Sequence, residues 1–139
     1  MEITRRRALM LGAAATAVAF LPFTPAIASA DDAIAKFTGG ADISEGGLTL
    51  TTPEIAENGN TVPVSVDAPG AVSIAIFASK NPVADVAVFN FGPLSGSQSA
   101  TTRMRLAGTQ NVIAVAKMAD GTFVRASNEV KVTIGGCGG

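Results

Sequence analysis

From residue 48 onward, most of the chain repeats hydrophobic positions with the two-residue period of a β-strand. The pattern is clearest where Val62, Val64 and Val66 alternate with Pro63 and Ser65. The same period, or a short continuous apolar run, predicts further strands at 48–50, 72–76, 86–91, 102–106, 112–116, 122–126 and 130–134. The runs at 86–91 and 112–116 are apolar on both faces, which is typical of strands covered on both sides and suits a partner sheet over one of them.

Residues that favour turns separate these runs at short intervals. Asp120-Gly121 stands between two apolar runs and predicts a two-residue hairpin. The stretch 92–102 is rich in Ser, Gly, Gln and Thr, and predicts a long loop. Two short segments favour helical turns instead. Residues 31–37 begin with two aspartates and end before a pair of glycines, and residues 53–57 follow Thr52 as a capping residue.

About eight short strands without a helix long enough for a crossover predict an all-β fold, an antiparallel β-sandwich of the immunoglobulin-like type. A short N-terminal helix precedes it. The Cys…Trp…Cys signature of antibody domains is absent, because the chain has one cysteine and no tryptophan. We therefore expect the immunoglobulin-like architecture without that signature.

The N-terminus has the order of an export signal. Thr4 is followed by three arginines and then by the uncharged run 8–23, and small residues follow at Ala26, Ala28 and Ala30. A basic region, a short apolar region and an A-x-A site mark a secretory leader, because the run is too short to span a membrane. The paired arginines indicate the twin-arginine route, which exports folded proteins. We expect cleavage after Ala30, with the position after Ala28 as the alternative.

These signals divide the chain into an export signal (1–30), a β-sandwich domain (31–134) and a short C-terminal tail (135–139). The chain has no histidine, so it cannot form a Ser-His-Asp triad or a His-ligated metal site. A single cysteine excludes an intrachain disulfide and a Cys-based zinc site. A net charge of −1 argues against nucleic acid as a partner. We predict no catalytic residues, no metal and no cofactor.

The tail is the sequence Gly135-Gly136-Cys137-Gly138-Gly139, directly after the last predicted strand. Four glycines in five positions predict a flexible tail that packs against nothing and places the Cys137 thiol about 10 Å beyond the sandwich. No basic residue flanks Cys137, so its activation must come from whichever enzyme receives the tail. That arrangement is typical of a carrier, in which partner enzymes supply the catalysis.

Other readings remain open at this point. Cys137 could serve as an intermolecular disulfide anchor of an interaction module, or could lie in a frayed terminus without a role. Glu54 and Glu57 could mimic an acid/base pair but are expected to be solvated, and Asp42 and Glu45 are expected to be loop carboxylates. A basic patch for an anion or an acidic partner is a weaker hypothesis, made of Arg103, Arg105 and Lys117.

Three stretches carry a resemblance to a known family. Residues 130–139, VKVTIGGCGG, resemble the C-terminus of the SoxY family, sulfur carriers of the periplasmic thiosulfate-oxidising system. Residues 37–40, FTGG, and 53–64, PEIAENGNTVPV, are also similar to that family, and the leader agrees. Ala8 and Met10 depart from the usual twin-arginine pattern.

The resemblance implies a function that the composition does not show. Cys137 would hold S-thiosulfonate and related sulfur adducts covalently, and the protein would be a periplasmic carrier without enzymatic activity of its own. A haem-containing enzyme would attach thiosulfate, a hydrolase would release sulfate and a sulfane dehydrogenase would oxidise the remaining sulfur. The carrier would form a heterodimer with a SoxZ subunit, which is exported alongside it.

Overall fold

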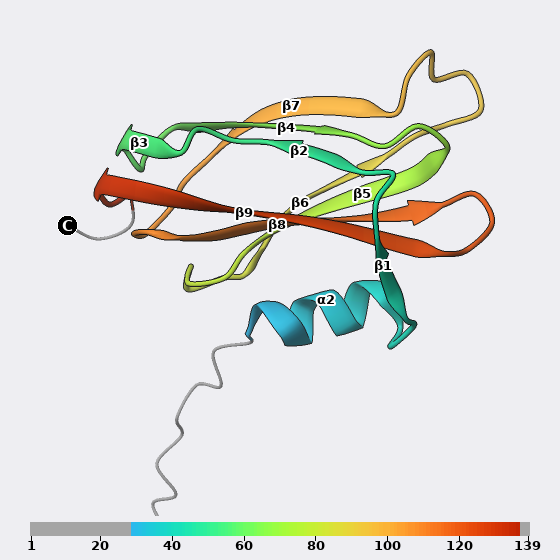
Figure 1. Ribbon diagram of the computed structural model, residues 1–139, viewed down its shortest axis with the longest axis horizontal. Coiled ribbons are helices and arrows are strands. Elements are labelled where there is room, and N and C mark those ends of the chain that lie inside the picture. Colours follow the sequence, from blue (N-terminus) through green and yellow to red (C-terminus); the bar gives the residue numbers. More distant parts are fainter. Residues whose placement is uncertain (1–28, 137–139) are drawn as a thin grey trace, which may run out of the picture.

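The computed structural model describes residues 29–136, which contain one helix and nine strands; Figure 1 shows how they are arranged. Residues 1–28 and the last three residues lie outside it. In chain order the elements are α2 (Ala30–Thr38), β1 (Ile43–Glu45), β2 (Thr49–Thr51), β3 (Ile55–Asn58), β4 (Val62–Asp67), β5 (Ala71–Ala78), β6 (Asp85–Asn90), β7 (Ser99–Met104), β8 (Gln110–Met118) and β9 (Phe123–Ile134).

The strands form two sheets that pack face to face, with the helix against the outer face of the larger one (Figure 1). The larger sheet has the order β1-β9-β8-β5-β6, and β3 also pairs with β9; the smaller sheet has the order β2-β4-β7. The immunoglobulin-like β-sandwich is thereby confirmed. It has one unpredicted feature, because β1 and β3 both run parallel to β9 along the same edge.

The core between the sheets follows the predicted alternation. Val62, Val64 and Val66 of β4 are at most 1% exposed and face Ile74 and Ile76 of β5 across the sandwich. The polar residues between the valines lie on the outer face of the smaller sheet, as the pleat of a strand requires. A hairpin at Asp120-Gly121 does join β8 and β9, with Gly121 at a φ of 87°, but its loop is longer than the predicted two residues because β8 ends at Met118 and β9 begins at Phe123.

Helix α2 is stabilised by local contacts at both ends. The Ser29 side chain accepts a hydrogen bond from the Asp32 amide at 3.2 Å, and the Asp32 carboxylate accepts one from the Ser29 amide at 3.3 Å. This reciprocal pair is a capping box. Gly39 ends the helix in the left-handed conformation, with a φ of 67°. The predicted helix at 31–37 is therefore confirmed.

The buried face of α2 covers the outer face of the larger sheet. Ile34 is 6% exposed, and the Phe37 ring meets the rings of Phe77 and Phe123 edge-on, with centroids 6.2 and 6.0 Å apart. Together with Ile113 of β8 they belong to a second apolar cluster. Residues 112–116 are therefore apolar on both faces because one face packs into the core between the two sheets and the other is covered by α2.

In the single chain, the segment 86–91 is covered on one face only. This segment is the edge strand β6, whose outward-facing Val88 is 52% exposed because α2 lies over β5, β8 and β9. Phe89 and Val86 do pack against the core between the sheets. One face of β6 therefore packs against the core between the sheets, and the helix does not cover the other face.

The helical turn predicted at 53–57 is also wrong, because this segment contains strand β3. The Lys131 amide donates to the Glu54 carbonyl at 2.9 Å, and Ala56 pairs with Val132 in parallel register. Ala56 is 7% exposed and joins the core. The free edge of β9 offers hydrogen bonds and burial that an isolated helical turn of five residues could not match.

The segments 122–126 and 130–134, which the sequence predicts as two strands, form a single strand, β9, without a turn between them. The Asn128 amide nitrogen donates to the carbonyl of Leu50 at 2.9 Å and contacts the Thr52 hydroxyl at 3.3 Å. The Asn128 side chain in β9 therefore links the larger sheet to β2 of the smaller one. The loop predicted at 92–102 is shorter than expected, because β7 begins at Ser99.

Candidate functional site

The candidate site lies where β9 ends and the C-terminal tail begins, beside β3 (Figure 1). Three segments meet there: the turn after β3, the loop between β7 and β8, and the first two residues of the tail. We call their contact residues the tail clasp, which consists of Gly59, Leu106, Ala107, Gly135 and Gly136. The predicted attachment residue Cys137 follows Gly136 directly in the sequence and lies, with Gly138 and Gly139, outside the described residues.

Backbone hydrogen bonds connect the three segments of the tail clasp. The Gly59 amide donates to the Ile134 carbonyl at 2.7 Å. The Leu106 amide donates to the Gly59 carbonyl at 2.8 Å, and the Gly136 amide donates to the Leu106 carbonyl at 2.7 Å. The β7–β8 loop is thus bonded both to the turn after β3 and to the tail, the turn is bonded to the end of β9, and the tail continues the hydrogen-bonded structure for two residues after β9.

The glycines of the tail clasp are needed because the three backbones approach closely. A Cβ atom on Gly59 would lie 2.5 Å from the Leu106 carbonyl oxygen and 2.8 Å from the Gly136 nitrogen. A Cβ on Gly135 would collide with the Ala107 carbonyl oxygen, and one on Gly136 would collide with the Gly59 carbonyl oxygen. At Gly135 and Gly136 these contacts contradict the prediction that the tail packs against nothing.

Two polar side chains hold the β7–β8 loop in place. The Asn81 side-chain oxygen accepts hydrogen bonds from the Ala107 amide at 3.0 Å and from the Gln110 amide group at 2.9 Å. Gln110 is 2% exposed and also accepts a bond from the Lys80 backbone amide at 2.8 Å. Sequence reasoning missed both residues. An asparagine before a proline, as at Asn81, favours a turn, and a polar residue at the start of an apolar run, as at Gln110, gives no sign of burial.

The tail clasp holds the backbone in place and contributes no reactive side chain. Its side chains carry no acid, base or charge, so it supplies no group that would activate a thiol. What it provides is a defined place for the backbone immediately before Cys137. This is consistent with the expectation from the sequence that activation of Cys137 comes from another protein.

The remaining candidate residues are not brought together. Arg103 lies on the outer face of the smaller sheet and donates to Thr61 at 3.4 Å. Lys117 pairs with Phe123 on the helix side of the larger sheet. The basic patch proposed for Arg103, Arg105 and Lys117 therefore does not form, because the first and last lie on opposite faces of the sandwich.

The carboxylates considered in the sequence lie at the surface. Glu54, Glu57, Asp42 and Glu45 are all exposed, as expected for solvated side chains. Residues 29–136 contain no cluster of three or more His, Cys, Asp or Glu side chains placed to hold a metal ion. The described helix is also too short and too polar to cross a membrane.

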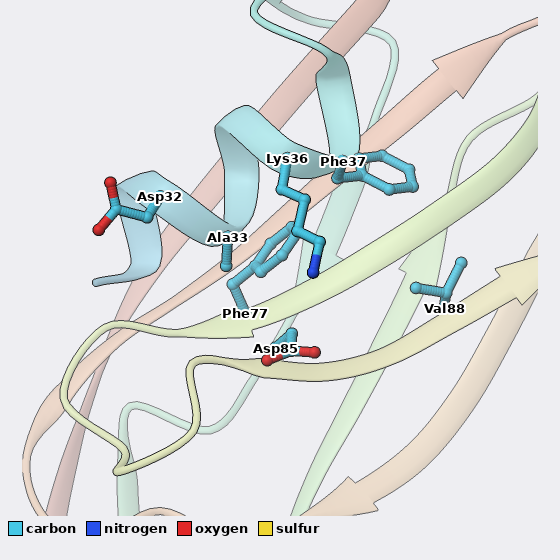
Figure 2. Close-up of a pocket in the computed structure, with 7 residues that line it drawn as sticks. All are labelled: Asp32, Ala33, Lys36, Phe37, Phe77, Asp85 and Val88. Atoms are coloured by element: carbon cyan, nitrogen blue, oxygen red, sulfur yellow. The ribbon is translucent and has the colours of Figure 1, made fainter. Parts of the chain in front are cut away.

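A separate cavity of about 300 Å³ lies between α2 and the strands β5 and β6. Figure 2 shows the Lys36 amine extending between the rings of Phe37 and Phe77 toward Asp85, with Val88 beside them. The sequence did not predict this cavity, since it depends on how the helix crosses the sheet. It belongs to the helix side of the molecule and shares no residue with the tail clasp.

The fold and the site together define a class of protein: a β-sandwich in which a cysteine near the C-terminus directly follows two glycines that the tail clasp holds. The profile of the family described as sulfur oxidation protein SoxY matches residues 34–137, a range that includes Cys137. The chain therefore belongs to the SoxY family.

Solved structures support this assignment. The sulfur carrier protein SoxY from Chlorobium limicola f thiosulfatophilum is 43% identical, with a TM-score of 0.66 over 75% of this chain and 96% of that one. Superoxide reductase (neelaredoxin) from Ignicoccus hospitalis is 16% identical, with a TM-score of 0.56 over 63% of this chain and 80% of that one. The second likeness shows the sandwich fold alone. No curated protein sequence matches this chain.

Proposed function

We propose that this protein carries sulfur intermediates of thiosulfate oxidation as covalent adducts on Cys137, in the periplasm. One observation carries the proposal: the match to the SoxY family extends through the cysteine, and the similar solved structure is a sulfur carrier protein. The lack of an activating side chain in the tail clasp supports a carrier that depends on partner enzymes for chemistry.

The first step is an oxidative conjugation. The Cys137 thiol loses its proton, and its Sγ forms a bond with the sulfane sulfur of thiosulfate. The two electrons leave one at a time to the haem groups of a partner enzyme, each of which accepts one, and the cysteine becomes an S-thiosulfonate. The carrier contributes the sulfur atom and its presentation, while the oxidant belongs to the partner.

The later steps regenerate the thiol. A hydrolase adds water across the bond between the sulfane sulfur and the sulfonate, so that sulfate leaves and a persulfide stays on Cys137. A sulfane dehydrogenase then oxidises the outer sulfur to a sulfonate, with three water molecules consumed and six electrons removed. A second hydrolysis releases sulfate and restores the thiol. The carrier works as a heterodimer with a SoxZ-like subunit, and the export signal delivers it through the twin-arginine route.

The test is the intact mass of the protein purified from thiosulfate-grown cells. We expect sulfur-containing adducts that are lost on reduction, and no adduct on the Cys137→Ser variant. Because Ser differs from Cys by one atom, the variant should keep its fold and its heterodimer. A mass that shows only a disulfide-linked homodimer would favour the intermolecular anchor and contradict the carrier.

A further inference from the structure

We propose that Gly59 is a positioning residue for the carrier thiol, because it anchors the base of the tail at the end of the sandwich. This inference rests on the proposed carrier function. It differs from a freely swinging arm of five residues, since Gly135 and Gly136 are held against the folded domain. Enzymes that act on the adduct would then have to approach the tail clasp itself.

The reach of the thiol depends on where the chain is last held. Beyond a fixed point, each residue adds about 3.5 Å to the reach of an extended chain. If the chain were free from Ile134 onward, Gly135 and Gly136 would both add to that reach. The bond from the Gly136 amide to Leu106 and the close packing of Gly135 against Ala107 remove that contribution. Cys137 follows the anchored residue Gly136 directly in the sequence.

Gly59 is the central residue of this anchor. Its amide binds the end of β9, its carbonyl accepts from Leu106, and its missing side chain leaves room for Gly136. Its φ lies outside the left-handed range, so an alanine at this position would meet the contacts and no backbone strain. The β7–β8 loop on the other side of the tail is held by Asn81 and the buried Gln110. The tail is thus held between the turn that contains Gly59 and the β7–β8 loop.

The proposal identifies the surface that receiving enzymes contact. Around the tail clasp, the exposed residues of the two supporting segments are Asn60, Thr61, Arg105 and Thr109. An active site that accepts the adduct must accommodate these residues together with Cys137. A misplacement of the reacting group by about 1 Å can cost an enzyme up to a hundredfold in rate, so the anchor has a direct effect on turnover.

The experiment compares Gly59→Ala with Gly108→Ala in the SoxZ-bound protein. Gly108 lies in the adjoining loop, and a Cβ there would meet no described atom within 4 Å. We expect Gly59→Ala to lose the hydrogen-exchange protection of the Gly136 amide and to lower kcat/KM with the partner enzymes between about ten- and a hundredfold. Alkylation of Cys137 by iodoacetamide should keep the wild-type rate, and Gly108→Ala should match the wild type in all three measurements.

A second variant keeps the test decisive if Gly59→Ala does not fold. Gly135→Ala disturbs the same anchor from the tail side, through the Ala107 carbonyl. Full turnover in a folded variant that has lost protection of the Gly136 amide would overturn the anchor proposal and leave the carrier function intact. Unchanged protection in both variants would overturn it as well. An absence of adducts in the wild type would instead contradict the carrier function itself.

A different observation, at the other end of the chain, carries a second proposal: the structure points to signal cleavage after Ala28. It rests on the proposed export. The bonds after Ala28 and after Ala30 both follow an A-x-A pattern. Ala30 is the first residue of α2 and is 7% exposed, within the apolar cluster under the helix. Proteases cut exposed and extended chain, so a folded export substrate protects the bond after Ala30.

The new amino terminus also fits at Ser29. Its nitrogen lies 3.3 Å from the Asp32 carboxylate oxygen, so cleavage after Ala28 would place an ammonium group beside that carboxylate. Cleavage after Ala30 would remove the capping residue Ser29 and with it both hydrogen bonds of the capping box, together with the buried first residue of the helix. The helix is therefore complete only when the mature chain keeps Ser29.

N-terminal sequencing of the exported protein tests this proposal. We expect the mature chain to begin at Ser29, and Ala26→Phe to slow processing because it alters the A-x-A pattern of that site alone. A chain beginning at Asp31, or unchanged processing of Ala26→Phe, would overturn the assigned site while leaving export intact. A chain that keeps its leader in every compartment would contradict export as well.

Discussion

The amide of Gly136 donates a 2.7 Å hydrogen bond to the carbonyl oxygen of Leu106. These residues are 30 positions apart in the sequence, and their contact holds the residue immediately before Cys137 against the folded domain. The tail therefore has an anchored part and a part that follows it. Under the carrier function proposed above, the first part decides where the thiol is presented and the second decides how it enters an active site.

Substituting Gln110 tests the support of the β7–β8 loop. Gln110→Ala leaves the Lys80 amide without its partner and removes one bond to Asn81 in a buried place. We expect the free energy of unfolding to fall by about 2–4 kcal/mol, as measured by urea denaturation. Gln98→Ala is the control, since Gln98 is half-buried and its bond to the Gly70 amide is longer, at 3.3 Å. Equal losses in the two variants would contradict this role of Gln110.

The packing of α2 is tested at Ile34. Ile34→Ala removes a buried side chain from the cluster between the helix and the larger sheet, so we expect a loss of about 2–4 kcal/mol in the free energy of unfolding. Lys36→Ala, which truncates an exposed side chain at the rim of the cavity on the same helix, should change it by no more than about 0.5 kcal/mol. A small effect of Ile34→Ala, measured by urea denaturation, would mean that the helix does not cover the sheet in solution.

The β8–β9 hairpin predicts a pH effect at Asp120. The Thr122 hydroxyl donates to the Asp120 carboxylate at 2.6 Å, and this bond, followed by one from the Thr122 amide, holds the pKa of Asp120 below its ordinary value. Thr122→Val removes the hydroxyl and should raise that pKa, as NMR titration would show.

The sign of the stability effect follows from the lowered pKa. A carboxylate whose pKa is lower in the folded state stabilises the fold above its unfolded pKa, and this stabilisation is lost as the pH falls through the folded value. The stability difference between wild type and Thr122→Val should therefore be full near neutral pH and shrink below about pH 4. A difference that grows on acidification would contradict the assignment.

The residues after the anchor are tested by Gly138→Val. This change adds β-branched bulk beside the thiol and restricts the backbone. We expect turnover with partner enzymes to fall about tenfold or more, while the alkylation rate of Cys137 and the protection of the Gly136 amide stay unchanged. Gly136→Val is the contrasting variant, because its side chain would collide with the Gly59 carbonyl and disturb the anchor. Undiminished turnover in Gly138→Val would show that the width of the tail at this position does not matter.

The sequence by itself determined the features that depend on neighbouring residues. The alternation at 62–66 placed three valines in the core, the acidic start and glycine end of α2 marked a helix, and Asp120-Gly121 marked a hairpin. The β-sandwich class followed from the number of such strands. The SoxY family could also be reached from the sequence, because the cysteine with its flanking glycines is a local motif.

The tertiary structure decided the features that depend on distant partners. Residues 53–57 became a strand because the edge of β9 was free to pair with them, and the second apolar face of β8 was covered by the chain's own helix. The anchoring of the tail could not be predicted from the sequence for the same reason, because it depends on distant segments. A run of glycines predicts flexibility when it is considered alone, yet Gly135 and Gly136 are held because Gly59 and the β7–β8 loop approach so closely that only glycine backbones fit.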